Sequence, residues 1–230
     1  MEILYSDRWL VVINKPAGLL SIQDGYNLDA PHVRTLLEPD FGRCWIVHRL
    51  DKETSGVLLL ARTKEAHRSI SILFEERKIS KEYRAIAKGK PPAGEFEINL
   101  PLLVNGDRRH RTIVDLERGK PALTMVEVIS SNIDWSLLRV KTKTGYTHQI
   151  RCHLAYKGFP LLGDALYTQK VSKPQTEEKS YIGRVALHSN NVNFVHPYTN
   201  QEVAFIAPYP PDLSALLDLI ITTRKTGGLN

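Results

Sequence analysis

Short apolar runs separated by polar turns make up most of the chain, and long amphipathic stretches are few. Residues 8–14 and 57–61 are rich in aliphatic side chains without alternation, the pattern of strands buried on both faces. Residues 81–88 alternate between apolar and polar side chains, as a half-buried strand does. Residues 124–129 and 135–142 predict two further strands, which the turn-forming residues between them join into a hairpin.

Helical patterns are confined to a few segments. Thr63 is a suitable N-cap, Glu65 falls in the first turn, and the following apolar side chains recur at helical spacing as far as Arg77. A second helix is expected from Thr147, as its cap, to Gly158, which ends it. Its N-terminus would be a good place for an anion.

The last part of the chain returns to short strands, expected at residues 185–189, 192–195 and 202–207. Pro211 then begins a helix, and residues 223–230 are expected to be a flexible tail. Many short strands, often joined as hairpins, with few helices between them favour the α+β class. We therefore expect a mostly antiparallel mixed β-sheet core with flanking helices.

The formal net charge of +6 permits a nucleic-acid partner without requiring one. Basic side chains gather at residues 78–90, 108–111 and 139–143. Each group alone is typical of a solvated face, whereas three groups around one site would form a track for phosphates.

Cys44 and Cys152 are the only cysteines, which argues against a disulfide framework and for a reducing compartment. The N-terminus lacks the basic start and apolar core of a secretory signal. No apolar run approaches the length of a membrane span. A cytoplasmic protein without membrane contact is therefore expected.

A dense polar stretch, His48 to Gly56, lies between the apolar residues 45–47 and 57–61. Two buried strands joined by such a stretch predict a turn that presents Arg49 and Asp51 at the edge of a rigid sheet. The spacing of Arg49 and Asp51 alone is more typical of a solvated turn than of an active site. Whether the turn is functional therefore depends on the other residues of the chain.

Several kinds of chemistry have no support in the sequence. His148 and His153 are five positions apart, which does not stack metal ligands on one helix face. No nucleophile elbow surrounds Ser55. What remains is a lone carboxylate, Asp51, acting as nucleophile or base, with Arg151 as the cation that would keep it ionised in a closed site.

The polar stretch 48–56, read as HRLDxxTSG, resembles the signature of RluA-type RNA pseudouridine synthases. Residues 14–18 resemble the first motif of that family, and 81–83 the segment that carries its active-site tyrosine. Residues 145–164 resemble its third motif, and 187–188 another short feature. The motifs follow the family order, and the likeness extends over about residues 2–210.

The resemblance implies a role for each matched residue. Asp51 would be the catalytic carboxylate, Arg151 its cationic partner, and Tyr83 the residue that packs against the target base and takes part in removing its C5 proton. Arg49 would enter the RNA stack where the target uridine leaves it. Substrate contacts are further expected from His48, Thr54, Lys15, Tyr146, His148, Gln149, Arg109 and Arg111.

The chemistry implied by the family agrees with these residue types. A uridine must leave the stack before its glycosidic bond can be reached, and a guanidinium plane can fill the vacancy. Cleavage of that bond develops oxocarbenium-like charge, which a carboxylate stabilises. Three routes stay open for Asp51, namely attack on the sugar, attack on the base, or removal of a 2′ proton. No metal or organic cofactor is implied.

The chain departs from the family pattern at Tyr146, where a basic residue is usual, and at Ser189, where alanine is common. No S4-type RNA-binding module is expected ahead of Lys15. The insert around 108–111 and the loop 23–43, with one short helix, are therefore expected to close over the substrate.

The resemblance predicts a single catalytic domain over residues 1–222, with two lobes around a central RNA-binding cleft. The expected partner is structured RNA, an rRNA or tRNA stem-loop, bound by a monomer without a protein partner. Two other functions stay open: a non-catalytic RNA-binding or RNA-folding protein, and a hydrolase that releases free uracil from RNA.

Overall fold

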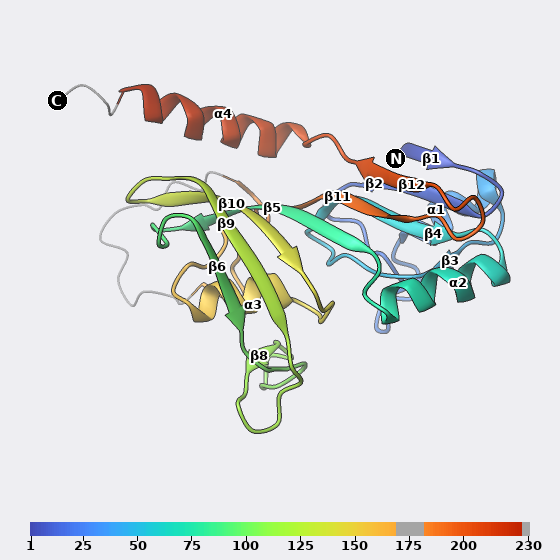
Figure 1. Cartoon of the computed structure of the whole chain (residues 1–230), viewed down its shortest axis with the longest axis horizontal. Coiled ribbons are helices and arrows are strands. Elements are labelled where there is room, and N and C mark those ends of the chain that lie inside the picture. The colour runs from blue at the N-terminus through green and yellow to red at the C-terminus, as the bar shows by residue number, and fades with distance from the viewer. Residues whose placement is uncertain (169–181, 227–230) are drawn as a thin grey trace. The chain divides into compact units, whose positions relative to one another are not determined.

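The computed structural model describes residues 1–168 and 182–226, and it divides into two compact units (Figure 1). The first unit comprises residues 1–83 and 188–208, and the second comprises 84–187 and the chain from 209 onward. Residues 227–230, part of the expected tail, lie outside the described residues. In the described part of the chain, no helix combines the length and apolarity that crossing a membrane requires.

The first unit is built on a sheet with strand order β1-β2-β4-β11, in which β12 pairs with β11 and β3 with β4. All of these pairs are antiparallel except β4 with β11, which is parallel. The strands are β1 (Glu2–Ser6), β2 (Leu10–Lys15), β3 (Trp45–Ile46), β4 (Ser55–Ala61), β11 (Leu187–Val195) and β12 (Glu202–Ile206).

The two aliphatic runs became the central strands of this unit. Every residue of β4 is buried, and so are Leu10 to Ile13 of β2. Helix α2 (Lys64–Glu75) packs on β4 (Figure 1) and begins as expected, because the Thr63 hydroxyl accepts a hydrogen bond from the Ala66 amide. The short helix expected in the loop 23–43 is α1 (Val33–Phe41).

The second unit contains a sheet with strand order β5-β10-β9-β6 and a separate β7–β8 hairpin. Helix α3 lies against β8 and β9 (Figure 1). In α4, Leu213, Leu216 and Leu217 pack on a core that includes Ile86. The elements are β5 (Ser80–Lys88), β6 (Glu95–Asn99), β7 (Leu102–Leu103), β8 (Ile113–Val114), β9 (Leu123–Ser131), β10 (Trp135–Thr142), α3 (Gln149–Tyr156) and α4 (Pro211–Thr226).

The α+β class with a mostly antiparallel sheet is confirmed, while some boundaries differ from expectation. The two strands expected at 185–189 and 192–195 are one strand, β11, because Ser189 pairs with Gly56 of β4 and Asn191 with Ile206 of β12. Thr147 does not cap α3: His148 occupies the N-cap with a left-handed φ of 55°. Helix α4 continues to Thr226, beyond the boundary expected at 222.

Candidate active site

Asp51 lies half-buried in a turn at the start of β4, and main-chain hydrogen bonds fix the turn on both sides. The Thr54 amide donates to the Asp51 carbonyl at 3.0 Å. The Ser21 hydroxyl donates to the Leu50 carbonyl at 2.7 Å and accepts from the Leu50 amide at 3.1 Å. The Gly18 amide donates to the Lys52 carbonyl at 2.8 Å. The segment after β2 therefore holds the backbone of the residues before and after Asp51.

Lys15 is fully buried, and its ammonium group belongs to the same support. The ammonium donates to the main-chain carbonyls of Pro16, Leu19 and Lys52, at 2.9, 2.7 and 3.1 Å. A lysine enters a protein interior only with such compensation, because an unpaired buried charge is very costly. Lys15 thereby holds the backbone of the Asp51 turn, and its expected contact with RNA stays a prediction.

Tyr83 in β5 is buried, with 9% of its surface exposed. Burial raises the pKa of its phenol above the ordinary value, and the charge of Asp51 raises it further. The phenol therefore keeps its proton at neutral pH. A protonated, buried ring is suited to forming an apolar wall, and it is less suited to removing a proton as a free base.

Two further residues of the polar stretch, Ser55 and Gly56, are fixed against β11. The Ser55 hydroxyl lies 2.9 Å from Nδ1 of His188, whose Nε2 lies 3.2 Å from the Ala207 carbonyl. A carbonyl can only accept, so Nε2 carries the proton and Nδ1 accepts from Ser55. A Cβ on Gly56 would lie 2.2 Å from the carbonyl oxygen of Ser189, so only glycine allows β4 and β11 to approach here.

The other substrate-binding candidates of the first unit differ in exposure. Arg49 is exposed, as a residue that enters an RNA stack must be. Thr54 is buried. Nε2 of His48 accepts a hydrogen bond from the Leu59 amide, and its ring packs on Phe74 with centroids 4.8 Å apart. Desolvation by burial, with a contribution from the Lys81 charge, lowers the pKa of His48 to about 3, so it is neutral at pH 7.

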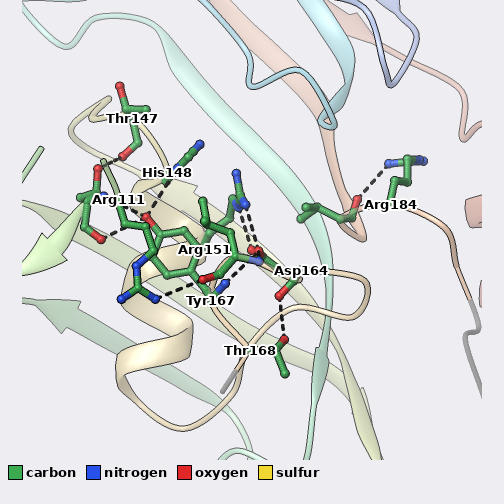
Figure 2. Close-up of polar contacts among 11 residues, drawn as sticks. Arg111, Thr147, His148, Arg151, Asp164, Tyr167, Thr168 and Arg184 are labelled. Carbon is green, nitrogen blue, oxygen red and sulfur yellow. Dashed lines mark hydrogen bonds and ion pairs between the residues drawn. The ribbon is translucent and has the colours of Figure 1, made fainter. Parts of the chain in front are cut away.

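In the second unit, Arg151 and Asp164 form a bidentate ion pair (Figure 2). Nε donates to Oδ2 at 2.7 Å and Nη2 donates to Oδ1 at 2.9 Å, and both side chains are almost fully buried. The Arg151 guanidinium also lies over the ring of Tyr167, 5.2 Å from its centroid. This geometry sets the guanidinium plane in one orientation.

The start of α3 brings together several other predicted residues. Gln149 is buried, and its amide group donates to the Leu123 carbonyl and the Thr124 hydroxyl. Its Oε1 accepts from the Tyr146 amide, so Gln149 has a structural task at this turn. His148 is half-buried, with Nδ1 3.2 Å from the Tyr167 hydroxyl.

The basic run forms the insert loop, residues 104–112, between β7 and β8. Asp107 organises this loop, because its carboxylate accepts hydrogen bonds from the amides of Arg109 and Arg111 and from Nε of Arg111. Nη1 of Arg111 donates to the Leu166 carbonyl at 3.1 Å, whereas Arg109 is exposed. Arg109 is therefore the better placed of the two for phosphate contact.

The expected site residues thus form one group in each unit, and the pairing of Asp51 with Arg151 stays a prediction. Sequence reasoning assigned no role to Ser21, His188, Asp164 or Tyr167. Asp164 belongs to residues 145–164, which resemble the third motif of the family, and His188 belongs to the short feature at 187–188. Membership of these motifs was therefore a signal that could have found both residues. Among the residues that the structure describes, no group of three or more His, Cys, Asp or Glu side chains could hold a metal ion.

Comparison with known proteins identifies what this arrangement resembles. A family model described as RNA pseudouridylate synthase matches residues 9–156. The dual-specificity RNA pseudouridine synthase RluA of Pasteurella multocida is 37% identical over 210 residues, covering 90% of this chain and 93% of that protein. The ribosomal large subunit pseudouridine synthase D of Zymomonas mobilis is 34% identical, covering 98% of this chain and 74% of that protein.

Solved structures agree with these sequence matches. Human RNA pseudouridylate synthase domain containing 4 superposes with a TM-score of 0.77 at 25% identity, covering 96% of this chain and 93% of that one. Human RNA pseudouridylate synthase domain containing 1 superposes with a TM-score of 0.74 at 26% identity, covering 97% and 94%.

Proposed function

We propose that this chain, which belongs to the RNA pseudouridylate synthase family, modifies a uridine in a stem-loop that both rRNA and tRNA can present. Family membership makes it an isomerase that acts on RNA. The reaction breaks the N1–C1′ bond of a uridine and joins C5 to C1′. The C5 proton leaves and N1 gains one, so atoms and electrons balance without a further reactant.

The anchored turn around Asp51 is the observation that carries the catalytic assignment. Leu50 is held by Ser21, and Lys52 by Lys15 and Gly18, so the carboxylate is presented from a rigid backbone. Rigid placement of a reacting group lowers the barrier, because its orientation is paid for during folding. We assign Asp51 as the catalytic carboxylate.

The remaining roles follow from exposure and charge. Tyr83, buried and protonated, forms the wall against which the detached uracil turns. Arg49, exposed beside Asp51, fills the place that the flipped uridine leaves in the stack. Arg151 is proposed as the cation that pairs with Asp51, on the strength of the family resemblance.

The expected target class follows from the relatives. One is named dual-specificity and another ribosomal large subunit, and the chain covers most of the length of each. A stem-loop uridine common to two RNA types fits both names. We propose a monomer in the cytoplasm, where the two cysteines, both free and buried, would stay reduced.

The experiment is a chemical map of pseudouridine in total tRNA and rRNA incubated with the protein. Wild type is compared with Asp51→Asn, and with Asp134→Asn as a control that makes the same change at an exposed carboxylate in the turn between β9 and β10. We expect new pseudouridine with wild type and Asp134→Asn and none with Asp51→Asn. Identical maps for all three proteins would refute the catalytic assignment. Free uracil in place of pseudouridine would indicate a hydrolase.

A further inference from the structure

Tyr167 lies at the centre of the polar group shown in Figure 2, and no role in the reaction has been assigned to it. It stands in the turn after Gly163, three residues beyond Asp164. The Asp164 carboxylate that binds Arg151 also accepts hydrogen bonds from the amides of Leu166 and Tyr167, at 3.1 and 3.2 Å. The acid that orients Arg151 thus also shapes the turn that carries Tyr167.

Two arginine guanidinium groups lie near the aromatic ring of Tyr167. Arg151 lies 5.2 Å from the ring centroid, and Arg111 of the insert loop lies 5.9 Å from it. A cation near an aromatic face is attracted by the ring quadrupole, more strongly where water is excluded. The ring therefore supports the guanidinium of Arg151, whose Nε and Nη2 are held by Asp164.

The hydroxyl of Tyr167 uses its full hydrogen-bonding capacity. It donates to the Thr112 carbonyl and accepts from the Thr112 amide, both at 3.0 Å. Its third neighbour is Nδ1 of His148, at 3.2 Å. A hydroxyl has one proton and two lone pairs, so with the proton given to Thr112, Nδ1 of His148 must be the donor. Nδ1 of His148 therefore carries a proton.

The phenol of Tyr167 can keep this hydrogen-bonding pattern at neutral pH. Burial raises the pKa of Tyr167 above its ordinary value, so the hydroxyl retains the proton that it donates to Thr112. Thr112 is itself buried, and its own hydroxyl donates to the Thr147 carbonyl at 2.7 Å. The insert loop is therefore joined to the residues directly before α3.

We infer that Tyr167 is a positioning residue for the isomerisation: its ring holds the Arg151 guanidinium, and its hydroxyl fixes the tautomer of His148 and joins the insert loop to α3. The inference rests on the proposed function, since Arg151 is placed there in the catalytic group. It adds that the orientation of the Arg151 guanidinium and the proton on Nδ1 of His148 both depend on one side chain outside that group.

The test uses Tyr167→Phe, which removes the hydroxyl and keeps the ring. Asp164→Asn is the more obvious change, but it leaves a buried arginine without its countercharge and endangers folding. The matched control is Tyr156→Phe, the same change at a residue of α3 that is 58% exposed. Thermal melting verifies that each variant is folded before it is assayed.

The first measurement is steady-state turnover on the RNA that wild type modifies. We expect kcat of Tyr167→Phe to fall on the order of 10- to 100-fold with KM within about twofold, because a ring without its two hydroxyl bonds to Thr112 no longer holds the Arg151 guanidinium in one orientation. Arg111 and the Thr112 hydroxyl still hold the insert loop, which is why KM should change little. An unchanged kcat, or an equal fall in Tyr156→Phe, overturns the inference.

The second measurement does not depend on activity. Nitrogen-15 spectra of histidine-labelled protein, with His148 assigned through His148→Gln, report the tautomer directly. We expect the Nδ1–H form in wild type and in Tyr156→Phe and its loss in Tyr167→Phe. An Nε2–H form in wild type, or an unchanged tautomer in Tyr167→Phe, overturns the inference. Identical pseudouridine maps for wild type and Asp51→Asn would refute the proposed function but would leave these spectra unchanged, so the two failures can be told apart.

Discussion

The ammonium of Lys15 lies 3.1 Å from the main-chain carbonyl oxygen of Lys52, the residue that follows Asp51. The same ammonium binds the carbonyls of Pro16 and Leu19. A residue expected to contact RNA is thus part of the frame that supports the proposed catalytic turn.

Replacement of Lys15 by methionine should impair folding and catalysis together. The variant keeps an unbranched side chain, one atom shorter, but removes the charged donor to three main-chain carbonyls, of which the bond to Leu19 is buried. Hydrogen bonds to a charged group are stronger than neutral ones, so we expect a loss of about 2–4 kcal/mol in the free energy of unfolding. Urea titration measures it. Lys52→Met, at an exposed side chain of the same turn, should change stability little. Equal effects of the two changes would contradict the support role.

Replacement of Gly56 by alanine should force β4 and β11 apart. The residue has a φ of 110°, and an added Cβ would lie 2.2 Å from the Ser189 carbonyl oxygen. Overpacking and backbone strain together predict a loss of about 2–5 kcal/mol, measured by urea unfolding. Gly25→Ala, where a Cβ meets nothing within 4 Å, is the matched control. A stable Gly56→Ala protein would mean that the two strands approach less closely than described.

Substitutions of Asp51 and Arg49 should affect different steps, the first turnover and the second base flipping. Asp51→Asn keeps the shape of the turn and should lower turnover by at least about 10³-fold, with RNA affinity nearly unchanged. Arg49→Ala should slow turnover by impairing extrusion of the uridine. Fluorescence of a 2-aminopurine beside the target reports flipping, and anisotropy reports affinity.

A mismatched target provides the control for Arg49. Unstacking costs least for an unpaired base, so Arg49→Ala should recover part of its turnover on RNA whose target uridine is already mismatched. Asp51→Asn should recover none. An equal loss of RNA affinity in both variants would count against this division of roles.

The low pKa of His48 predicts lower stability in acid. Between about pH 3 and its ordinary pKa near 6.5, the unfolded chain binds a proton at this residue that the folded chain does not. The free energy of unfolding must therefore fall as pH decreases through this range. His48→Gln should lose less stability than wild type between pH 7 and 4.5, in urea titrations at both values. His110→Gln, at an exposed residue, should behave as wild type.

Some elements could be predicted because their signals are local. Thr63 caps α2 through a hydrogen bond with a residue in the first turn. The apolar runs became β2 and β4 because a short run of aliphatic side chains without alternation is typical of a strand buried on both faces. The break expected between residues 189 and 192 of β11 was wrong, because the signal that continues this strand is not local. Its polar residues pair with β4 and β12, which are distant in sequence.

The candidate site divides in the same way. HRLDxxTSG and its companion motifs indicated Asp51, Tyr83 and Arg151 from the sequence, because residue identity and order carry that information. The left-handed backbone of His148 could not be foreseen, since the Tyr167 hydroxyl that accepts from its Nδ1 also binds Thr112 of the insert loop, which is distant in sequence.

The fold class, the strands with uniform or alternating burial, and the family could all be predicted from the residues and their order. Which polar residues face inward depends on contacts that form only in the folded chain. Lys15 reads as a basic residue free to meet RNA, and Asp164 as part of a turn, until the carbonyls around one and the guanidinium beside the other are in place. Burial of a charge is possible only where distant segments supply its partners, and those partners exist only in the folded chain.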